Sequence, residues 1–201
     1  MPAEPTRADA RENRRRILEA AEEVFGHGGA DASTEEVAEL ARVGIATVFR
    51  HFPTKAALLE EVLLRRFARL RDHAASLADT DDAGEAFESL FRYVVADAPG
   101  KIAIGEAMVA VGAAHERASE VAEQYRAQVA TLLRRAQKSG AIRKDVGVQE
   151  VQALLVGTAR AGVLMQLDEA VRDRLVRVAL DGLRTSSGRR PRVSSQDASH
   201  E

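Results

Sequence analysis

The chain has 201 residues, of which 45% are hydrophobic and 30% charged, so it can bury a sizeable core in one or two domains. It contains no cysteine, which excludes disulfides, thiolate nucleophiles and cysteine-ligated zinc. The net charge of −2 gives no support for nucleic-acid binding, so any such role must rest on a motif. Aromatic residues make up only 4%, which favours helices over strands.

Two further absences bear on location. No run of about 18 apolar residues is present to span a membrane. The first residues, Met1-Pro2-Ala3-Glu4-Pro5, lack the apolar segment of a secretory signal. We therefore expect a cytoplasmic protein with no membrane partner.

Helical periodicity predicts nine helices and no strand. The first is expected over 10–27 and ends at Gly28-Gly29. The second begins after Ser33, where Ser33-Thr34-Glu35-Glu36 predicts a capping box. A short break at Arg42-Val43-Gly44 separates it from a third helix over 45–51.

Six more helices complete the expected fold, over 55–78, 83–97, 101–113, 116–138, 148–166 and 169–184. Pro99-Gly100 is expected to end the fifth helix, since proline removes a helical hydrogen bond. Residues 1–9 are expected to be flexible. The tail over 185–201, rich in serine, arginine and glycine, is expected to be disordered.

The second and third helices, joined by a tight turn, predict a helix-turn-helix. In that motif the second helix lies across the DNA backbone and the third enters the major groove. The segment over 37–59, VAELARVGIATVFRHFPTKAALL, resembles without a gap the signature of the TetR family of bacterial transcriptional regulators. The arginine-rich first helix and the segment GAIRKDV over 140–146 also fit that family.

The resemblance implies an all-α fold in two parts. These are a helix-turn-helix DNA-binding domain over 10–54 and a helical ligand-binding and dimerisation domain over 55–184. It further implies a bacterial transcriptional repressor whose partners are an operator in double-stranded DNA, a second copy of the chain and a small-molecule effector. No cofactor, metal or catalytic residue is expected.

The resemblance also places the residues expected to contact DNA at the starts of the second, third and fourth helices and along the third. They are Ser33, Thr34, Gly44, Ile45, Ala46, Thr47, Phe49, Arg50, His51 and Lys55. For Arg14, Arg15 and Arg16 the sequence leaves two interpretations open, phosphate contact or a solvated helix face.

Three positions depart from the family signature. Arg42 occupies a turn position usually held by glycine, which costs about 1–2 kcal/mol if the residue is left-handed. Gly44 replaces the usual serine or threonine cap of the third helix. Phe49 replaces a tyrosine and so cannot donate a phenolic hydrogen bond.

Two further sites are expected in the C-terminal helices. The pocket candidates are Phe87, Phe91, Ile104, Glu106, Met108, His115, Tyr125, Arg160, Met165 and Gln166. The dimer candidates are Ala153, Leu154, Gly157, Ala161, Leu175, Ala179 and Leu183, which include small residues at four-residue steps. For both sets, ordinary packing within one chain is the alternative.

Two other functions compete with a ligand-released repressor. One is a ligand-independent or architectural DNA-binding protein, which the local rather than global basic charge disfavours. The other is a helical enzyme, for which the five histidines show no metal-ligand spacing and the glycines form no phosphate loop.

Overall fold

The computed structural model describes residues 7–112 and 116–185. Within these ranges the chain forms eight α-helices and one 3₁₀ turn, η1 (Gly29–Asp31). The helices are α1 (Arg7–Gly28), α2 (Thr34–Leu40), α3 (Ile45–His51), α4 (Lys55–Ser76), α5 (Ala83–Ala110), α6 (Glu116–Lys138), α7 (Val148–Leu164) and α8 (Glu169–Leu183). The predicted all-α class is confirmed.

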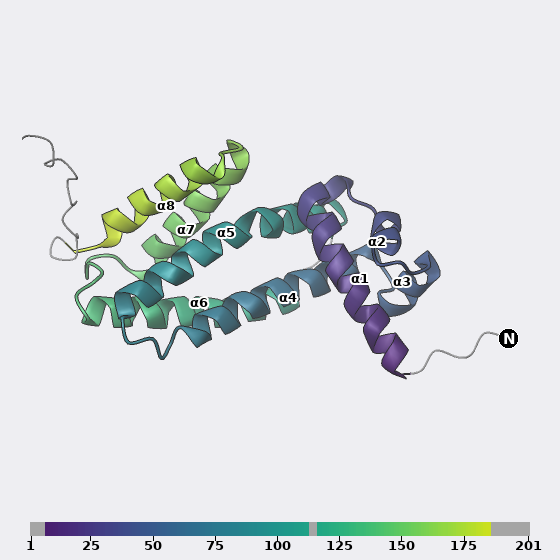
Figure 1. Cartoon of the computed structure of the whole chain (residues 1–201), viewed down its shortest axis with the longest axis horizontal. Coiled ribbons are helices and arrows are strands. Elements are labelled where there is room, and N and C mark those ends of the chain that lie inside the picture. Colours follow the sequence, from purple (N-terminus) through teal and green to yellow (C-terminus); the bar gives the residue numbers. More distant parts are fainter. Residues whose placement is uncertain (1–6, 113–115, 186–201) are drawn as a thin grey trace, which may run out of the picture.

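The helices form an elongated molecule with two ends (Figure 1). Helices α1, α2 and α3 gather at one end, while α4, α5 and α6 run lengthwise from it. Helices α7 and α8 pack together, with α7 against α5, at the other end.

Two hydrophobic clusters form the core. The first joins α1, α2 and α3 to the start of α4 and to the end of α5, where Ile104, Ala107 and Met108 are fully buried. The second joins the rest of α4 and the start of α5 to α6, α7 and α8, around Phe87 and Phe91. Helix α5 therefore contributes side chains to both clusters.

The expected break at Pro99-Gly100 is wrong, because α5 continues through both residues to Ala110. Eight α-helices are consequently found in the described residues where nine were expected. Proline inside a helix costs a hydrogen bond and a steric clash with the preceding turn. Burial of α5 on both sides of this point, in the second cluster before it and in the first after it, supplies the packing that offsets the cost.

The ends of the chain also differ in part from expectation. Helix α1 begins at Arg7, three residues before the predicted start. Thr185 is described and its amide donates to the carbonyl of Ala141. The expectations of flexibility for 1–6 and disorder for 186–201 lie outside the described residues.

Gly100 has a specific packing role. A Cβ at this position would lie 2.7 Å from Cζ of Arg66, so only glycine leaves room for that guanidinium against α5. Arg66 Nε lies 3.0 Å from Glu22 Oε1 on α1, and its Nη2 lies 3.5 Å from Asp97 Oδ1 on α5. One arginine of α4 thus pairs with carboxylates of both neighbouring helices.

No helix within 7–112 and 116–185 combines the length and the apolar character needed to cross a membrane.

We predict opposite effects for two glycine substitutions in α5. Gly105→Ala should raise the free energy of unfolding by about 0.5–1 kcal/mol, since an added Cβ meets nothing within 4 Å and alanine favours the helix. Gly100→Ala should lower it, because the guanidinium of Arg66 must shift away from the added Cβ and then pairs less well with its two carboxylates. Urea unfolding followed by circular dichroism measures both, and equal stabilisation by the two variants would contradict the packing role of Gly100.

Candidate DNA-binding interface and ligand cavity

Helix α2 begins with the predicted capping box, which is confirmed. The Ser33 hydroxyl accepts from the Glu36 amide at 3.1 Å, and the Ser33 amide donates to Glu36 Oε2 at 2.7 Å. The Ser33 amide and the Ser33 hydroxyl, which also donates to Glu36 Oε2 at 3.0 Å, hold the pKa of the Glu36 carboxyl below its usual value. The geometry fixes where α2 starts and therefore how the following turn is presented.

The turn between α2 and α3 forms around a left-handed residue, Arg42, with φ 53°. The Arg42 amide donates to the Glu39 carbonyl at 3.0 Å, and the Val43 amide donates to the Ala38 carbonyl at 3.0 Å. This pair of bonds is a Schellman motif, which usually carries glycine at the left-handed position. The turn is therefore as tight as the motif requires, although its central residue is strained.

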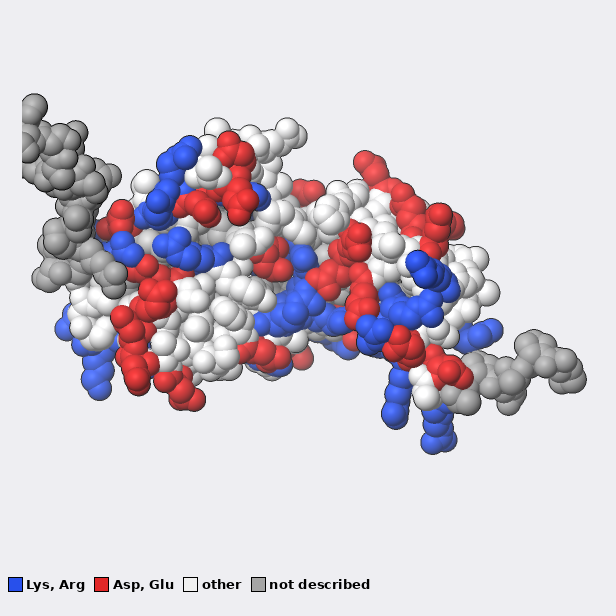
Figure 2. All heavy atoms as spheres, viewed as in Figure 1, with Lys and Arg blue, Asp and Glu red and all other residues white. Residues whose placement is uncertain are grey.

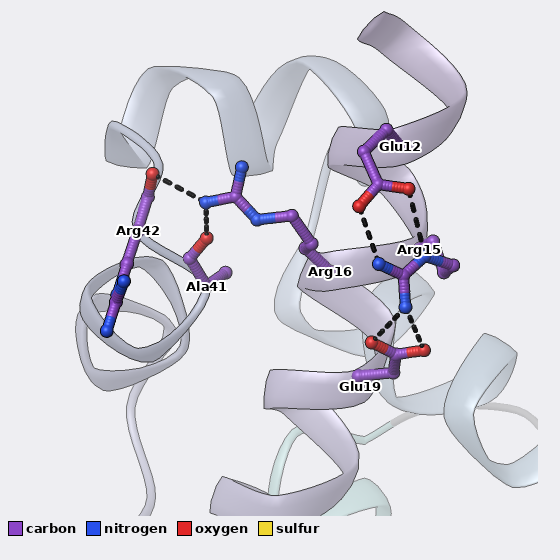
Figure 3. A network of polar contacts seen from close by, with 6 residues as sticks. All are labelled: Glu12, Arg15, Arg16, Glu19, Ala41 and Arg42. Atoms are coloured by element: carbon purple, nitrogen blue, oxygen red, sulfur yellow. Dashed lines mark hydrogen bonds and ion pairs between the residues drawn. The ribbon is translucent and has the colours of Figure 1, made fainter. Parts of the chain in front are cut away.

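Arg16 of α1 supports this turn from outside, as Figure 3 shows. Its Nη2 donates to the carbonyl of Ala41 and, at 2.9 Å, to that of Arg42. These carbonyls lie at the C-terminal end of α2, where a cation also complements the helix dipole. A side chain from the first helix thus holds the turn that orients the third.

The other two arginines of the run are also paired within the chain. Arg15 bonds to Glu12 and Glu19 on the same helix and points away from the segment between α2 and α3 (Figure 3). These bonds lower the pKa of Glu12 and raise that of Arg15. Arg14 pairs with Glu61 of α4 at 3.2 Å and lies over the Phe52 ring. All three arginines therefore have partners within the chain, which neither interpretation of this run included, and phosphate contact stays a prediction.

Helix α3 presents small, polar and aromatic side chains to the surface. Ala46 and Arg50 are exposed, Thr47 is half-buried, and Phe49 is 40% exposed. The same helix anchors itself to the first cluster through Val48, which is buried. One face of α3 is therefore packed against the first cluster, and the other, its free face, is exposed.

The remaining candidates of this interface lie around α3. Gly44 is the N-cap of α3 in an extended conformation and, like Ile45, is exposed. His51 is half-buried, and its ring is tilted against that of Phe52. Thr34 is buried beneath the start of α2, so the structure does not bring it to the surface with the others.

Lys55 has a structural partner that the sequence did not indicate. Its Nζ donates to the carbonyl of Ala32 at 2.6 Å and to that of Ala30 at 3.4 Å, and it lies over the Phe25 ring. The side chain thereby ties the start of α4 to the segment between α1 and α2. The end of the helix-turn-helix is held at the same point by the Thr54 hydroxyl, which accepts from the Ala57 amide.

Charge is mixed over the surface. Figure 2 shows lysine and arginine side chains interspersed with acidic ones over the visible face, without a continuous basic stripe. This agrees with the net charge and means that the arrangement of α2 and α3, rather than bulk charge, carries the indication of DNA binding.

A cavity of about 740 Å³ lies between α5, α6 and α7, with Phe67 of α4 at one side. Its wall is mainly apolar, and its size is that of a small-molecule site. Among the predicted pocket residues, Glu106, Tyr125 and Arg160 line it. Glu106 and Arg160 are exposed, whereas Tyr125 is only 7% exposed.

Four predicted pocket residues do not line the cavity, because they form the core. Phe87 and Phe91 are buried in the second cluster, and Ile104 and Met108 are buried in the first. Apolar residues at helical spacing look the same in sequence whether they face a cavity or a neighbouring helix.

The last three pocket candidates fall elsewhere. Met165 is the C-cap of α7 and is 67% exposed. Gln166 has φ 49° and forms the turn into α8, where its amide donates to the Val163 carbonyl. His115 lies outside the described residues.

Lys101 is a cavity residue that the sequence analysis missed. It lies at the point where α5 was expected to break, so its helical face could not be followed past Pro99. On a continuous helix, Val94, Ala98, Lys101 and Gly105 recur at three- and four-residue steps and mark one face. This periodicity is the sequence feature that could have indicated Lys101 as a cavity residue.

Helices α7 and α8 leave an apolar face uncovered. The dimer candidates Ala153, Leu154 and Gly157 are exposed, and Ala161, Leu175 and Ala179 are half-buried. The structure contradicts one candidate, Leu183, whose side chain is buried in the second cluster and so is not on the surface. Three residues that the sequence analysis missed are more exposed, namely Leu164 at 85%, Met165 and Val178.

Taken together, the tight turn between α2 and α3 and the free face of α3 define a helix-turn-helix DNA-binding protein. Residues 17–62 match the family profile "Bacterial regulatory proteins, tetR family". Residues 82–185, more than half of the chain, match the profile "Transcriptional regulator SbtR-like, C-terminal domain". The chain belongs to the TetR family of bacterial transcriptional regulators.

Solved structures agree over nearly the whole chain. A TetR transcription regulatory protein from Mycobacterium vanbaalenii is 37% identical with a TM-score of 0.71, covering 89% of this chain and 99% of that one. The regulator SCO0520 from Streptomyces coelicolor is 31% identical with a TM-score of 0.71, covering 86% of this chain and 99% of that one.

Curated relatives match over a shorter region. The transcriptional repressor KstR of Mycolicibacterium smegmatis is 43% identical over 61 residues, which are 30% of this chain and 30% of the relative. The match therefore spans less than a third of that repressor's length, and what the repressor does as a whole protein is not transferred by it.

We predict that Arg42→Gly stabilises the chain by about 0.5–1 kcal/mol, because glycine adopts the left-handed conformation without strain. The exposed Arg42 side chain is not needed for the bond from Arg16, which goes to the backbone carbonyl. Urea unfolding measures the change. The matched control Arg134→Gly, inside α6, should destabilise by about 1 kcal/mol, and a similar loss at position 42 would contradict the strain.

Proposed function

We propose that this protein is a repressor that binds a near-palindromic operator as a homodimer and releases it when a small molecule occupies the cavity. The observation that carries the proposal is the free face of α3 beside a turn held by Arg16. Two such helices in a dimer would enter successive major grooves about 34–36 Å apart.

The DNA contacts are assigned by position. Ala46, Thr47 and Arg50 on α3 face the base edges, where a threonine methyl or an arginine guanidinium can distinguish base pairs. Gly44, Ile45 and Phe49 provide close apolar contact. Backbone phosphates are contacted from the rim by the side chains of Ser33, His51 and Lys55.

The dimer forms through the uncovered apolar face of α7 and α8. Exposed apolar side chains there would be buried against the same face of a second copy, as a two-fold interface requires. Gly157 lies within this face, and a Cβ on it would meet nothing within 4 Å in the single chain. The domain division at residue 54 remains part of the proposal, with α4 and α5 connecting the two parts.

Release follows from the two roles of α5. The helix lines the cavity with Lys101 and Gly105, and its last turns bury Ile104 and Met108 among α1, α2 and α3. A ligand that favours a displaced α5 would favour displaced recognition helices and shift the population away from the DNA-bound form. Arg66, paired with Glu22 and Asp97, couples α4 to the same movement.

We predict that selection from a random duplex library at physiological salt enriches an inverted repeat. The double substitution Thr47→Ala and Arg50→Ala should abolish that specific binding while leaving the fold intact, since both side chains lie on the free face of α3. Arg134→Ala on α6 is the matched control and should bind as the parent does. Unchanged binding by the double variant would contradict the assignment of α3 as the helix that contacts the bases.

We further predict that Gly157→Arg converts the dimer into a folded monomer. The site is open in the single chain, so the fold is kept, whereas a second helix could no longer approach. Light scattering after size exclusion gives the mass. Ala127→Arg, on the exposed side of α6, should remain dimeric, and a dimer in both variants would place the interface elsewhere.

A further inference from the structure

The deep wall of the cavity holds two polar side chains among apolar ones. Lys101 of α5 and Tyr125 of α6 lie there with Val94, Ala98 and Leu155, which are buried. Of the other polar lining residues, Glu106, Arg126 and Arg160 are exposed and so belong to the mouth, whereas Gln152 of α7 is half-buried. The charge and the phenolic donor that a ligand's buried end meets therefore come from Lys101 and Tyr125.

Tyr125 is built in without a partner. Its side chain is 7% exposed, and its buried hydroxyl makes no hydrogen bond within the described structure. Leaving a buried hydroxyl unsatisfied costs about 1–3 kcal/mol, so such a group in a cavity wall indicates a ligand atom that bonds to it.

Lys101 is a second donor at the same depth. Its Nζ lies 5.2 Å from the centre of the Phe67 ring, and within 7–112 and 116–185 it forms no ion pair shorter than 4 Å. Burial lowers the pKa of this ammonium, because the charged form loses hydration. An anion beside it would compensate for that loss.

The nearby carboxylate does not take this role. Asp97, one helical turn before Lys101, is not part of the cavity wall, and its Oδ1 pairs with Arg66. Burial raises the pKa of Asp97, whereas Arg66 and Lys101 act in the opposite direction, and Asp97 forms no ion pair shorter than 4 Å with Lys101. The polar groups that a ligand meets away from the mouth are thus an ammonium, which only donates, a phenol free to donate, and the amide of Gln152.

We propose that the cavity binds a largely apolar carboxylate, whose tail occupies the space between α5, α6 and α7 and whose carboxylate accepts from Lys101 Nζ and the Tyr125 hydroxyl. The apolar wall excludes small hydrophilic anions such as acetate. The inference deepens the proposed function and rests on it, because it gives the chemical class of the effector.

The test measures binding of defined probes to the full chain by calorimetry. Decanoate represents a flexible tail and biphenyl-4-carboxylate a rigid aromatic one, each compared with its neutral primary amide, and decylamine represents a cation. We expect at least one carboxylate to bind about tenfold more tightly than its amide, and acetate not to compete. Whichever of the two carboxylates binds more tightly indicates whether the tail of the ligand is aliphatic or aromatic.

Variants assign the preference to the two side chains. Lys101→Met should remove the preference for carboxylate over amide, and Tyr125→Phe should weaken carboxylate binding about threefold to tenfold. Lys138→Met, on the exposed end of α6, and Tyr93→Phe, outside the cavity, are the matched controls and should bind as the parent does. Lys101→Met removes a buried charge, so it should not unfold the chain.

The inference would be overturned by equal binding of carboxylate and amide, by tighter binding of decylamine, or by no binding of any probe. A ligand hydroxyl bridging Tyr125 and Asp97 would appear as tighter binding of decanol than of decanoate and would also overturn it. Selection of operator DNA needs no ligand, so failure of the repressor proposal would show there independently of these measurements.

Discussion

The guanidinium of Arg66 lies against Gly100 and pairs with Glu22 and Asp97. The arrangement of α1, α4 and α5 depends on these ion pairs. A largely buried ion pair recovers little net free energy, since the charges lose hydration. Its value is geometric, because the three helices must keep one register for both carboxylates to be reached. Arg69 adds two further bonds to Glu22, so this one carboxylate of α1 binds two arginines of α4.

The same constraint explains why one helix can belong to two cores. Helix α5 packs against Arg66 at Gly100, which has no side chain. The part of α5 before Gly100 belongs to the second cluster, and the part after it belongs to the first. A helix packed on both sides does not deform gradually, so a displacement at the cavity is passed along it as a whole. The cavity wall and the packing beneath α1, α2 and α3 thus share one helix.

Local features were predictable from the sequence, whereas features that depend on distant contacts were not. The capping box at Ser33 and the tight turn at Arg42 depend on residues a few positions apart, and both are present. The continuation of α5 through Pro99 depends on burial in two clusters, which no short window contains. Because that continuation was missed, Lys101 was missed with it, and core residues such as Ile104 were assigned to the pocket.

The scarcity of aromatic residues has a spectroscopic consequence. The chain has no tryptophan and only two tyrosines, Tyr93 and Tyr125, so its ultraviolet emission comes from tyrosine alone. Tyr93 stacks on His73 at 3.9 Å, while Tyr125 faces the cavity. The two phenols therefore have different surroundings, and the emission of Tyr125 is an intrinsic, label-free reporter of what occupies the space between α5, α6 and α7.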